Sequence, residues 1–383
     1  MYKINHLKIS GIRKLRAIDI QTRPLMVLIG ANGVGKTSLL DAYSLLSASA
    51  VGNLGKNLSK AGGMSSILTR DKAEELSLYV DMNVPGHQPL EYELRLATSG
   101  TGYRISRELL SQRRIEDKAE GFKHIVSQDG DIRYYDSDNG GLVRPNWEYN
   151  PYETSLSQVP KMFRQPEELR RILGSVTQYH VLDVSSRAPV KLPQQMKPAE
   201  LPGANGEDLI SFLYYLRESN RHRYEAIEDT LKAAFPNFQS LSFPPVAAGM
   251  LSLTWQDSSF TKPFFMNELS EGTLRFLWLV ALLQSPGLST VTMIDEPEVS
   301  LHPELLSLLA ELLREASQRT QLIVATHSDR LVRFLKPEEV VVLDSDDDGC
   351  TTASRGDSLD LGQWLDEYSL DEVWQMGLLG GRP

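Results

Sequence analysis

Residues 30–37 read Gly-Ala-Asn-Gly-Val-Gly-Lys-Thr, and this stretch decides the fold. It matches the pattern G-x-x-x-x-G-K-[ST] in full. The apolar run at 25–29 precedes it and is typical of a strand buried on both faces. Apolar residues at helical spacing follow it and predict a helix over 37–46. The order strand, glycine loop and helix therefore predicts a phosphate-binding loop.

The residue types in this loop indicate which ligand it holds. Glycines let the backbone curl so that successive N–H groups point at phosphate oxygens, and the following helix adds the positive end of its dipole. Lys36 supplies a positive charge for the β- and γ-phosphates, and the Thr37 hydroxyl is a ligand for Mg²⁺. We therefore expect ATP and Mg²⁺ as cofactors. The expected nucleotide-binding residues are Asn32, Gly33, Val34, Gly35, Lys36, Thr37 and Ser38.

A second candidate cluster is the acidic pair Asp295-Glu296, which ends the apolar run 291–294. An aspartate at the end of a strand can hold Mg²⁺, and the adjacent glutamate can polarise an attacking water. Taken alone the pair is also consistent with an ordinary strand end. Its neighbours favour the catalytic interpretation. Leu-Ser-Glu-Gly-Thr stands at 269–273, and His327 follows the next predicted strand.

With these motifs in this order, the chain resembles the ABC-type ATPases of the RecF and chromosome-maintenance (SMC) superfamily, including the AAA_21 predicted ATPases. The resemblance makes Ser270 and Gly272 the signature motif, Asp295 and Glu296 the Walker B pair, and His327 the switch histidine. Glu271 and Thr273 depart from the usual LSGGQ pattern. Residues 299–302 are similar to the D-loop of that superfamily.

The resemblance implies further roles for single residues. Gln158, between a β region and a helical region, is expected to be the Q-loop ligand of Mg²⁺ together with Thr37 and Asp295. Arg13, after the opening strand, is expected to contact phosphate or adenine. Glu296, His327 and Lys36 are the expected catalytic residues. Ser270 and Gly272 are expected to face the γ-phosphate held by a second subunit, which implies an ATP-dependent head-to-tail homodimer.

The expected fold class is α/β: an ABC-type P-loop head with a mixed sheet, flanking helices and an N-terminal antiparallel β region. Residues 1–50 and 250–383 are expected to form this core. Residues 51–150 predict an inserted β region and 151–249 a helical lid, with 208–224 helical. Strands alternate with helices after residue 270, which supports a sheet covered by helices.

Composition narrows the class of protein further. The 383 residues carry a net charge of −10, which argues against a chain that coats nucleic acid by bulk electrostatics. The single cysteine, Cys350, excludes an internal disulfide. The N-terminus lacks a signal peptide and no apolar run is long enough to span a membrane, so we expect a cytoplasmic protein. The middle of the chain also has basic clusters, which form either ordinary solvated surface or a local anion-binding surface. Their members are Arg104, Arg107, Arg113, Arg114, Lys161, Arg164, Arg170 and Arg171.

Three functions remain open from the sequence. The first is an ATP-driven switch that couples hydrolysis to a DNA or protein partner, in DNA repair or antiviral defence. The second is an ATPase that gates a separately encoded nuclease or toxin effector. The third is the nucleotide-binding subunit of a transporter, which the large β insertion disfavours. The acidic run 344–349 predicts a polar hairpin turn rather than a nuclease metal site, and Trp364 and Trp374 are expected to be packing residues.

Overall fold

The computed structural model describes residues 3–113, 121–359, 362–365 and 367–380. The chain divides into two compact units. The first comprises residues 1–177, 337–368 and 373–383, and the second comprises 178–336 and 369–372. Both combine helices with sheets, so the expected mixed α/β class is confirmed. In the described part of the chain, no helix has the length and apolar character needed to cross a membrane.

The first unit is built on an antiparallel sheet. In spatial order its strands are β2 (Leu15–Gln21), β1 (Lys3–Ile12), β4 (Glu75–Asn83), β5 (Leu90–Ser99), β6 (Gly102–Gln112), β7 (Phe122–Gln128), β8 (Asp131–Asp136) and β9 (Gly141–Val143). Along β4 and β5 buried side chains alternate with more exposed ones. Leu78 pairs with Leu94 and Val80 with Tyr92, so the register places the apolar residues of both strands on one face.

A second group of strands in this unit carries the phosphate loop. β3 (Leu25–Ile29) pairs in parallel with β18 (Val340–Ser345), which pairs antiparallel with β19 (Thr351–Arg355). All five residues of β3 are buried, as expected for a strand covered on both faces. The loop after β3 leads directly into α1 (Lys36–Ala50). The sequence predictions for this strand and this helix are confirmed.

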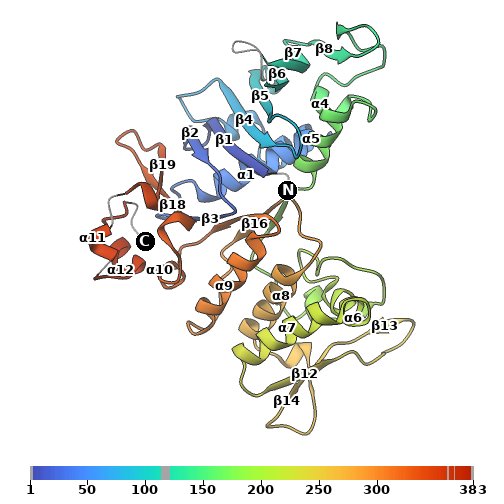
Figure 1. Ribbon diagram of the computed structural model, residues 1–383, viewed down its shortest axis with the longest axis vertical. Coiled ribbons are helices and arrows are strands. Elements are labelled where there is room, and N and C mark those ends of the chain that lie inside the picture. The colour runs from blue at the N-terminus through green and yellow to red at the C-terminus, as the bar shows by residue number, and fades with distance from the viewer. Residues whose placement is uncertain (1–2, 114–120, 360–361, 366, 381–383) are drawn as a thin grey trace. The chain divides into compact units, whose positions relative to one another are not determined.

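Helices complete the first unit, and α1 packs against α5 (Figure 1). The others are α2 (Leu54–Lys60), α3 (Met64–Ile67), α4 (Ser155–Gln158), α5 (Arg164–Gly174) and α11 (Gly362–Leu365), with 3-10 turns η3 (Pro337–Glu339) and η4 (Gly356–Ser358). Helix α12 (Leu370–Gln375) begins in the second unit and ends in the first.

The second unit has a pair of parallel strands, β16 (Val291–Asp295) and β17 (Gln321–Ala325). β10 (Thr177–Tyr179) lies beside β16. Two small antiparallel sheets are formed by β11 (Gln194–Gln195) with β13 (Met250–Leu251), and by β12 (Phe238–Ser242), β14 (Thr254–Asp257) and β15 (Phe264–Phe265).

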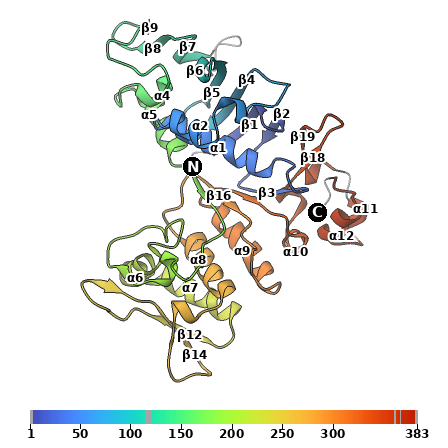
Figure 2. The same cartoon turned by 180° about the vertical axis from the view of Figure 1, so that it is seen from behind.

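Four helices of the second unit pack in chain order, each on the next (Figure 2). They are α6 (Leu209–Ser219), α7 (Arg221–Ala234), α8 (Glu271–Gln284) and α9 (Leu305–Ser317). The short α10 (Asp329–Val332) and the 3-10 turns η1 (Pro189–Lys191) and η2 (Met266–Glu268) complete the unit. The helical stretch predicted over 208–224 is two helices, because Asn220 leaves the helical conformation and its side chain accepts from the Arg223 N–H.

The two compact units group these segments differently from the domain boundaries predicted from the sequence. Strands β4 to β9 continue the sheet begun by β1, so residues 51–150 share one compact unit with the N-terminal strands. The helices α6 and α7 instead share a unit with α8 and the strand β16. The two tryptophans also differ. Trp374 is fully buried as expected, whereas Trp364 is exposed, so the prediction that Trp364 is a packing residue is wrong.

Candidate nucleotide-binding site

The phosphate loop has the backbone conformation that its glycines allow. Gly33 and Gly35 have φ values of 72° and 125°, which side-chain-bearing residues rarely adopt. Gly30 has a φ of 139°, and a Cβ atom there would lie 2.2 Å from the carbonyl oxygen of Leu343 on β18. The loop therefore needs glycine both for its curl and for its close approach to the neighbouring strand.

Lys36 lies inside this loop. Its side chain is only 5% exposed, and its Nζ donates to the carbonyls of Gly30 at 2.5 Å and Ala31 at 3.0 Å. The start of α1 has no side-chain cap and no acidic residue in its first turn, so its N–H groups and dipole are available to an anion. Thr37 is exposed at this helix start. These features match the needs of a bound triphosphate and its Mg²⁺.

The other expected loop residues divide by exposure. Asn32 and Gly33 are exposed at the tip of the loop, whereas Val34, Gly35 and Ser38 are buried. All of them lie in the first unit with Lys36 and Thr37, so the structure brings the expected phosphate-binding residues together.

Thr351 on β19 supports the loop, a role that no sequence pattern indicated. Its Oγ1 donates to the carbonyl of Val34 at 2.5 Å, and its N–H donates to the carbonyl of Lys14 at 2.8 Å. A Cβ atom on Gly35 would come within 2.7 Å of the same hydroxyl and 3.1 Å of a methyl of Leu15. One threonine thus ties the phosphate loop to the turn between β1 and β2.

Arg13 lies in that turn, with a φ of 46°. Its guanidinium contacts the Asp41 carboxylate on α1 at 2.5 Å, and both side chains are partly exposed. Asp41 follows Lys36 by about one and a half turns of helix. Arg13 is therefore held beside the helix that follows the loop. Its contact with a nucleotide stays a prediction.

Gln158 lies away from the phosphate loop. Thr154, which caps α4, donates from its Oγ1 to the carbonyl of Ser49 at 2.7 Å. Ser49 is near the far end of α1 from Lys36, and at 1.5 Å per residue the two are about 20 Å apart. The Gln158 amide accepts from the Asn150 N–H at 2.6 Å and donates to the Asn150 and Thr154 carbonyls at 3.0 and 3.2 Å. The prediction that Gln158 is a magnesium ligand with Thr37 is wrong.

The second unit brings together Glu296 and His327, two of the expected catalytic residues. β16 ends at Asp295, which pairs with Ala325 of β17, and the Glu296 N–H donates to the Ala325 carbonyl at 2.8 Å. Glu296 has a left-handed φ of 49°, which turns the chain sharply at the end of the strand. Its carboxylate lies 3.6 Å from Nε2 of His327, and both side chains are partly exposed.

Glu298 is a further, half-buried carboxyl of this cluster that sequence reasoning missed. Its Oε1 accepts from the Thr326 hydroxyl at 2.5 Å and from the His327 N–H at 3.3 Å. Burial raises the pKa of Glu298 above its ordinary value, and the nearby Glu296 charge acts in the same direction. Glu298 therefore positions the backbone of His327. The acidic pattern Asp-Glu-Pro-Glu at 295–298 is the sequence feature that could have pointed to Glu298.

β10 places two more polar residues near Asp295. The Nδ1 atom of His180 lies 3.9 Å from the Asp295 carboxylate, and His180 is largely exposed. Gln178 precedes it by two residues on the strand beside β16. Sequence reasoning missed both, because only the strand order shows that β10 is next to the Walker B strand.

The signature motif opens α8. Ser270 is its N-cap, and its Oγ accepts from the Thr273 N–H at 3.1 Å. A Cβ atom on Gly272 would lie 2.5 Å from the Ser300 carbonyl, so this glycine lets the helix start approach the D-loop. Arg275 donates to the Ser300 hydroxyl and to the Leu182 carbonyl. Ser270 and Glu271 are exposed, so the helix start is accessible.

The basic clusters of the β region are mostly paired with acids. Arg104 contacts Asp129, Arg107 contacts Glu93, Arg113 contacts Glu91 and Arg170 contacts Glu167. Arg114 lies outside the described residues. These pairs support the interpretation of the clusters as solvated surface.

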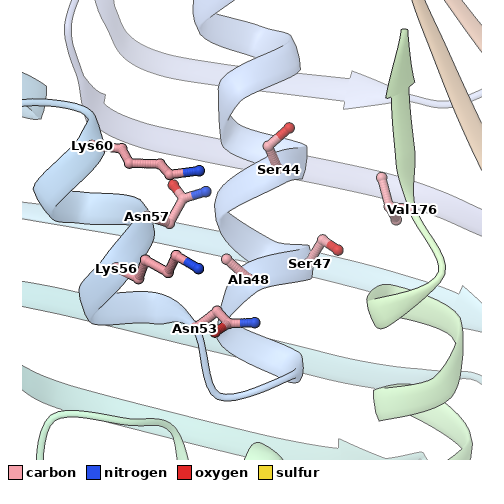
Figure 3. A pocket seen from close by; sticks show the side chains of 8 residues that line it. All are labelled: Ser44, Ser47, Ala48, Asn53, Lys56, Asn57, Lys60 and Val176. Carbon is pink, nitrogen blue, oxygen red and sulfur yellow. The ribbon is translucent and has the colours of Figure 1, made fainter. Parts of the chain in front are cut away.

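A pocket of about 270 Å³ beside α1 differs from these clusters. Figure 3 shows Asn53, Lys56, Asn57 and Lys60 on or just before α2, with Ser44 and Ser47 on α1. Among the described residues, no carboxylate lines the pocket or pairs with Lys56 or Lys60. Two ammonium groups one helical turn apart, with amides and hydroxyls around them, are suited to an anion.

The acidic run 344–349 forms the turn between β18 and β19, as the sequence predicted. Asp348 pairs with Arg16 at 3.1 Å and with Lys72 at 3.8 Å. Within the described ranges, no group of three His, Cys, Asp or Glu side chains is arranged to hold a metal ion. The turn is thus held by cations of the same unit.

Comparison with known proteins places this geometry in a family. A solved structure of SmcHead bound to the C-winged helix domain of ScpA is similar over 95% of this chain and 99% of that chain, with 14% identity and a TM-score of 0.59. An Smc head domain with an extended coiled coil, bound to the C-terminal domain of ScpA derived from Pyrococcus furiosus, is similar over 96% and 99%, with 14% identity and a TM-score of 0.53. No curated protein matches the sequence.

These structural likenesses confirm the expected P-loop fold of the SMC head type. The sequence model of the AAA_21 family, described as "AAA domain, putative AbiEii toxin, Type IV TA system", matches residues 25–333. This match covers most of the chain, and the chain therefore belongs to the AAA_21 family.

Proposed function

We propose that this chain is a cytoplasmic, Mg²⁺-dependent ATPase that works as a molecular switch in a head-to-tail homodimer. ATP closes the dimer and hydrolysis opens it, and a bound partner senses the change. The accessible start of α8, with Ser270 and Glu271 exposed, is the observation that carries the dimer. An uncovered helix N-terminus is suited to the γ-phosphate of a second subunit.

In this proposal each half of the site has its own task. The curled backbone of the loop and Lys36 bind the triphosphate, while Thr37 and Asp295 hold Mg²⁺, which offsets phosphate charge. Glu296 accepts a proton from the attacking water. His327, 3.6 Å from Glu296, contacts the γ-phosphate. Gln178, on the strand beside Asp295, takes the role we had expected for Gln158.

The experiment that tests the dimer uses Glu296→Gln in the full chain. This change keeps the shape of the side chain and removes the general base. We expect hydrolysis to fall at least about 100-fold while ATP binding is retained. Light scattering after size-exclusion chromatography should then show a dimer with Mg-ATP and a monomer without nucleotide.

Glu304→Gln is the matched control, because Glu304 is an exposed carboxylate of the same unit that pairs with His302. It should hydrolyse ATP at the wild-type rate. A Glu296→Gln chain that binds ATP but stays monomeric at every protein concentration would exclude the sandwich.

DNA is our first candidate partner, and the pocket between α1 and α2 supports it. Lys56 and Lys60 offer two ammonium groups with no acidic neighbour in the pocket (Figure 3). A phosphodiester backbone would fit this surface, and its binding would weaken with salt. We expect Lys56→Ala with Lys60→Ala to reduce duplex binding about tenfold and to lower the salt dependence by about two ions.

Lys232→Ala is a suitable control for that measurement, since Lys232 is exposed in the second unit and pairs with Asp229. Fluorescence anisotropy at several salt concentrations would compare the variants. Equal DNA affinity in all variants would show that this surface does not bind DNA.

The second candidate partner is a separately encoded nuclease or toxin that the ATPase gates. The family description, which names a putative toxin of a toxin–antitoxin system, favours this candidate. It predicts that the Glu296→Gln chain retains an effector protein in the presence of ATP. Affinity purification with and without ATP, followed by an assay for nuclease activity, separates the two candidates.

A further inference from the structure

The inserted part of the first unit contains a pocket of about 320 Å³ that none of the proposed ATPase residues line. It lies between strands β7 and β8 and the segment that leads into α5. The residues that matter for the argument are Phe122, His124, Tyr134, Tyr135, Phe163 and Arg164. Its size is near the lower limit for small-molecule pockets, so its ligand is small.

Aromatic rings form the walls of this pocket. The Phe122 ring centroid lies 4.4 Å from that of Tyr135 and 4.8 Å from that of His124. Tyr134 lies 5.0 Å from Phe163. The rings meet edge to face, at angles of 68° to 72°, rather than in parallel stacks. Such walls favour a flat, aromatic ligand.

His124 places a buried polar atom in these walls. The residue is 8% exposed, and its Nε2 has no hydrogen-bond partner in the described structure. Burial lowers the pKa of His124 to about 4, so the ring is neutral near pH 7. A neutral imidazole nitrogen can donate or accept one hydrogen bond. A buried group without a partner is costly, and a ligand with a polar edge would satisfy it once a rotation of the ring brings Nε2 to the pocket surface.

The start of α5 supplies the complementary charge. Residues 163–166 line the pocket, and this eleven-residue helix has no side-chain hydrogen bond at its N-cap. Glu167 in the first turn pairs with Arg170, and Pro166 has no N–H, so the N–H groups of Arg164 and Gln165 and the helix dipole are what favour an anion here. Arg164 at the same position is exposed, and no described residue pairs with it. An anion-binding end thus adjoins the aromatic walls.

We propose that this pocket binds one nucleoside monophosphate unit. The base lies against the aromatic rings with a polar edge at His124, and the phosphate lies at the start of α5 beside Arg164. Each part of the pocket has a counterpart in that ligand, whereas an inorganic anion would leave the aromatic walls and His124 unused. Two sources share this chemistry: a free mononucleotide and the 5′-phosphorylated end of a single strand.

The test measures binding by calorimetry to the full chain carrying Lys36→Ala, which weakens the phosphate loop. The probes are AMP, GMP, CMP and UMP, and a trinucleotide with and without its 5′-phosphate. We expect saturable binding of at least one mononucleotide or of the phosphorylated trinucleotide. Preference for the free nucleotide or for the strand end identifies the source. Arg164→Ala should weaken binding about tenfold, and His124→Phe should weaken it further.

Lys161→Ala is the matched control, because Lys161 is a nearby exposed cation that does not line the pocket. It should leave the affinity unchanged. If His124→Phe fails to fold, judged by circular dichroism, the Arg164→Ala result decides. The proposal is overturned if no probe binds, if binding survives Arg164→Ala unchanged, or if phosphotyrosine binds more tightly than every nucleotide, which would indicate a protein ligand.

Discussion

The phosphate loop of the first unit and the acidic cluster of the second unit are built in different ways. The loop is made mainly of backbone, and its Lys36 is almost fully buried between carbonyl groups. The acidic cluster is made of side chains, with Glu296 and His327 41% and 32% exposed. Glu296 also has a left-handed backbone, as does Ser300 in the D-loop.

In the proposed mechanism, this difference separates nucleotide binding from hydrolysis. A backbone cradle keeps one shape, so it can hold a phosphate without rearrangement. Exposed side chains on strained turns can change position when a second surface arrives, and strain of this kind often accompanies functional sites. The comparison suggests that the first half-site fixes affinity and the second sets the rate of hydrolysis.

Lys36→Ala should give the largest effect. Removing the ammonium leaves the phosphate charge unpaired, and a loss of about 3 kcal/mol corresponds to about 100-fold weaker ATP binding. Titration with a fluorescent ATP analogue measures this directly. Lys232→Ala should bind ATP as the wild type does. Affinity within threefold of wild type for Lys36→Ala would mean that the loop is not the nucleotide site.

Thr351→Val should give a smaller effect on the same measurement. The variant keeps the shape of the side chain but loses the hydrogen bond to the Val34 carbonyl, which is worth about 1 kcal/mol. We expect about fivefold weaker ATP binding with an unchanged rate of hydrolysis at saturation. Thr352→Val is the control, since Thr352 is exposed on the same strand and contacts Asp344. An equal loss in both variants would argue against a specific brace.

Glu298→Gln should give the smallest effect, and it concerns the second unit. The folded state raises the pKa of Glu298, so it binds more protons than the unfolded chain just above the ordinary value of 4.5. The stability due to this proton is present below pH 4.5 and is lost as the pH rises through the folded pKa. Glutamine cannot titrate, so the variant should lose less stability than the wild type on that rise.

Urea denaturation at several pH values from 4 to 8 measures this difference, with Glu304→Gln as the exposed control. A Glu298→Gln chain with the wild-type pH dependence would show that Glu298 does not carry the effect. In that case, titration of this carboxyl would not distinguish the acidic cluster from the phosphate loop.

The sequence predicted what local patterns encode. The strand 25–29, the loop at 30–37 and the helix after it have strong local signatures, and the structure has all three. Ser270 as an N-cap is also a local property of the chain. These features depend on residues only a few positions apart, so a single sequence is enough to find them.

Long-range placement could not be predicted in the same way. Gln158 occupies a suitable position in the chain, but its segment packs at the far end of α1 from the phosphate loop. Thr351 and His180 reach their sites only through strand order and hairpin pairing. Trp364 and Trp374 have similar sequence surroundings, yet only one is buried. Burial and proximity of this kind depend on tertiary structure.

The bond from Thr351 to Val34 joins residues 317 positions apart. During synthesis at about 5 to 20 residues per second, the ribosome therefore needs roughly 15 to 60 s after making the glycine loop to add the threonine that braces it. Until then the nascent chain exposes an unsupported loop. The last 33 of the 383 residues thus decide when the brace of the phosphate loop is complete, and we expect a chain that ends before Thr351 to bind nucleotide more weakly.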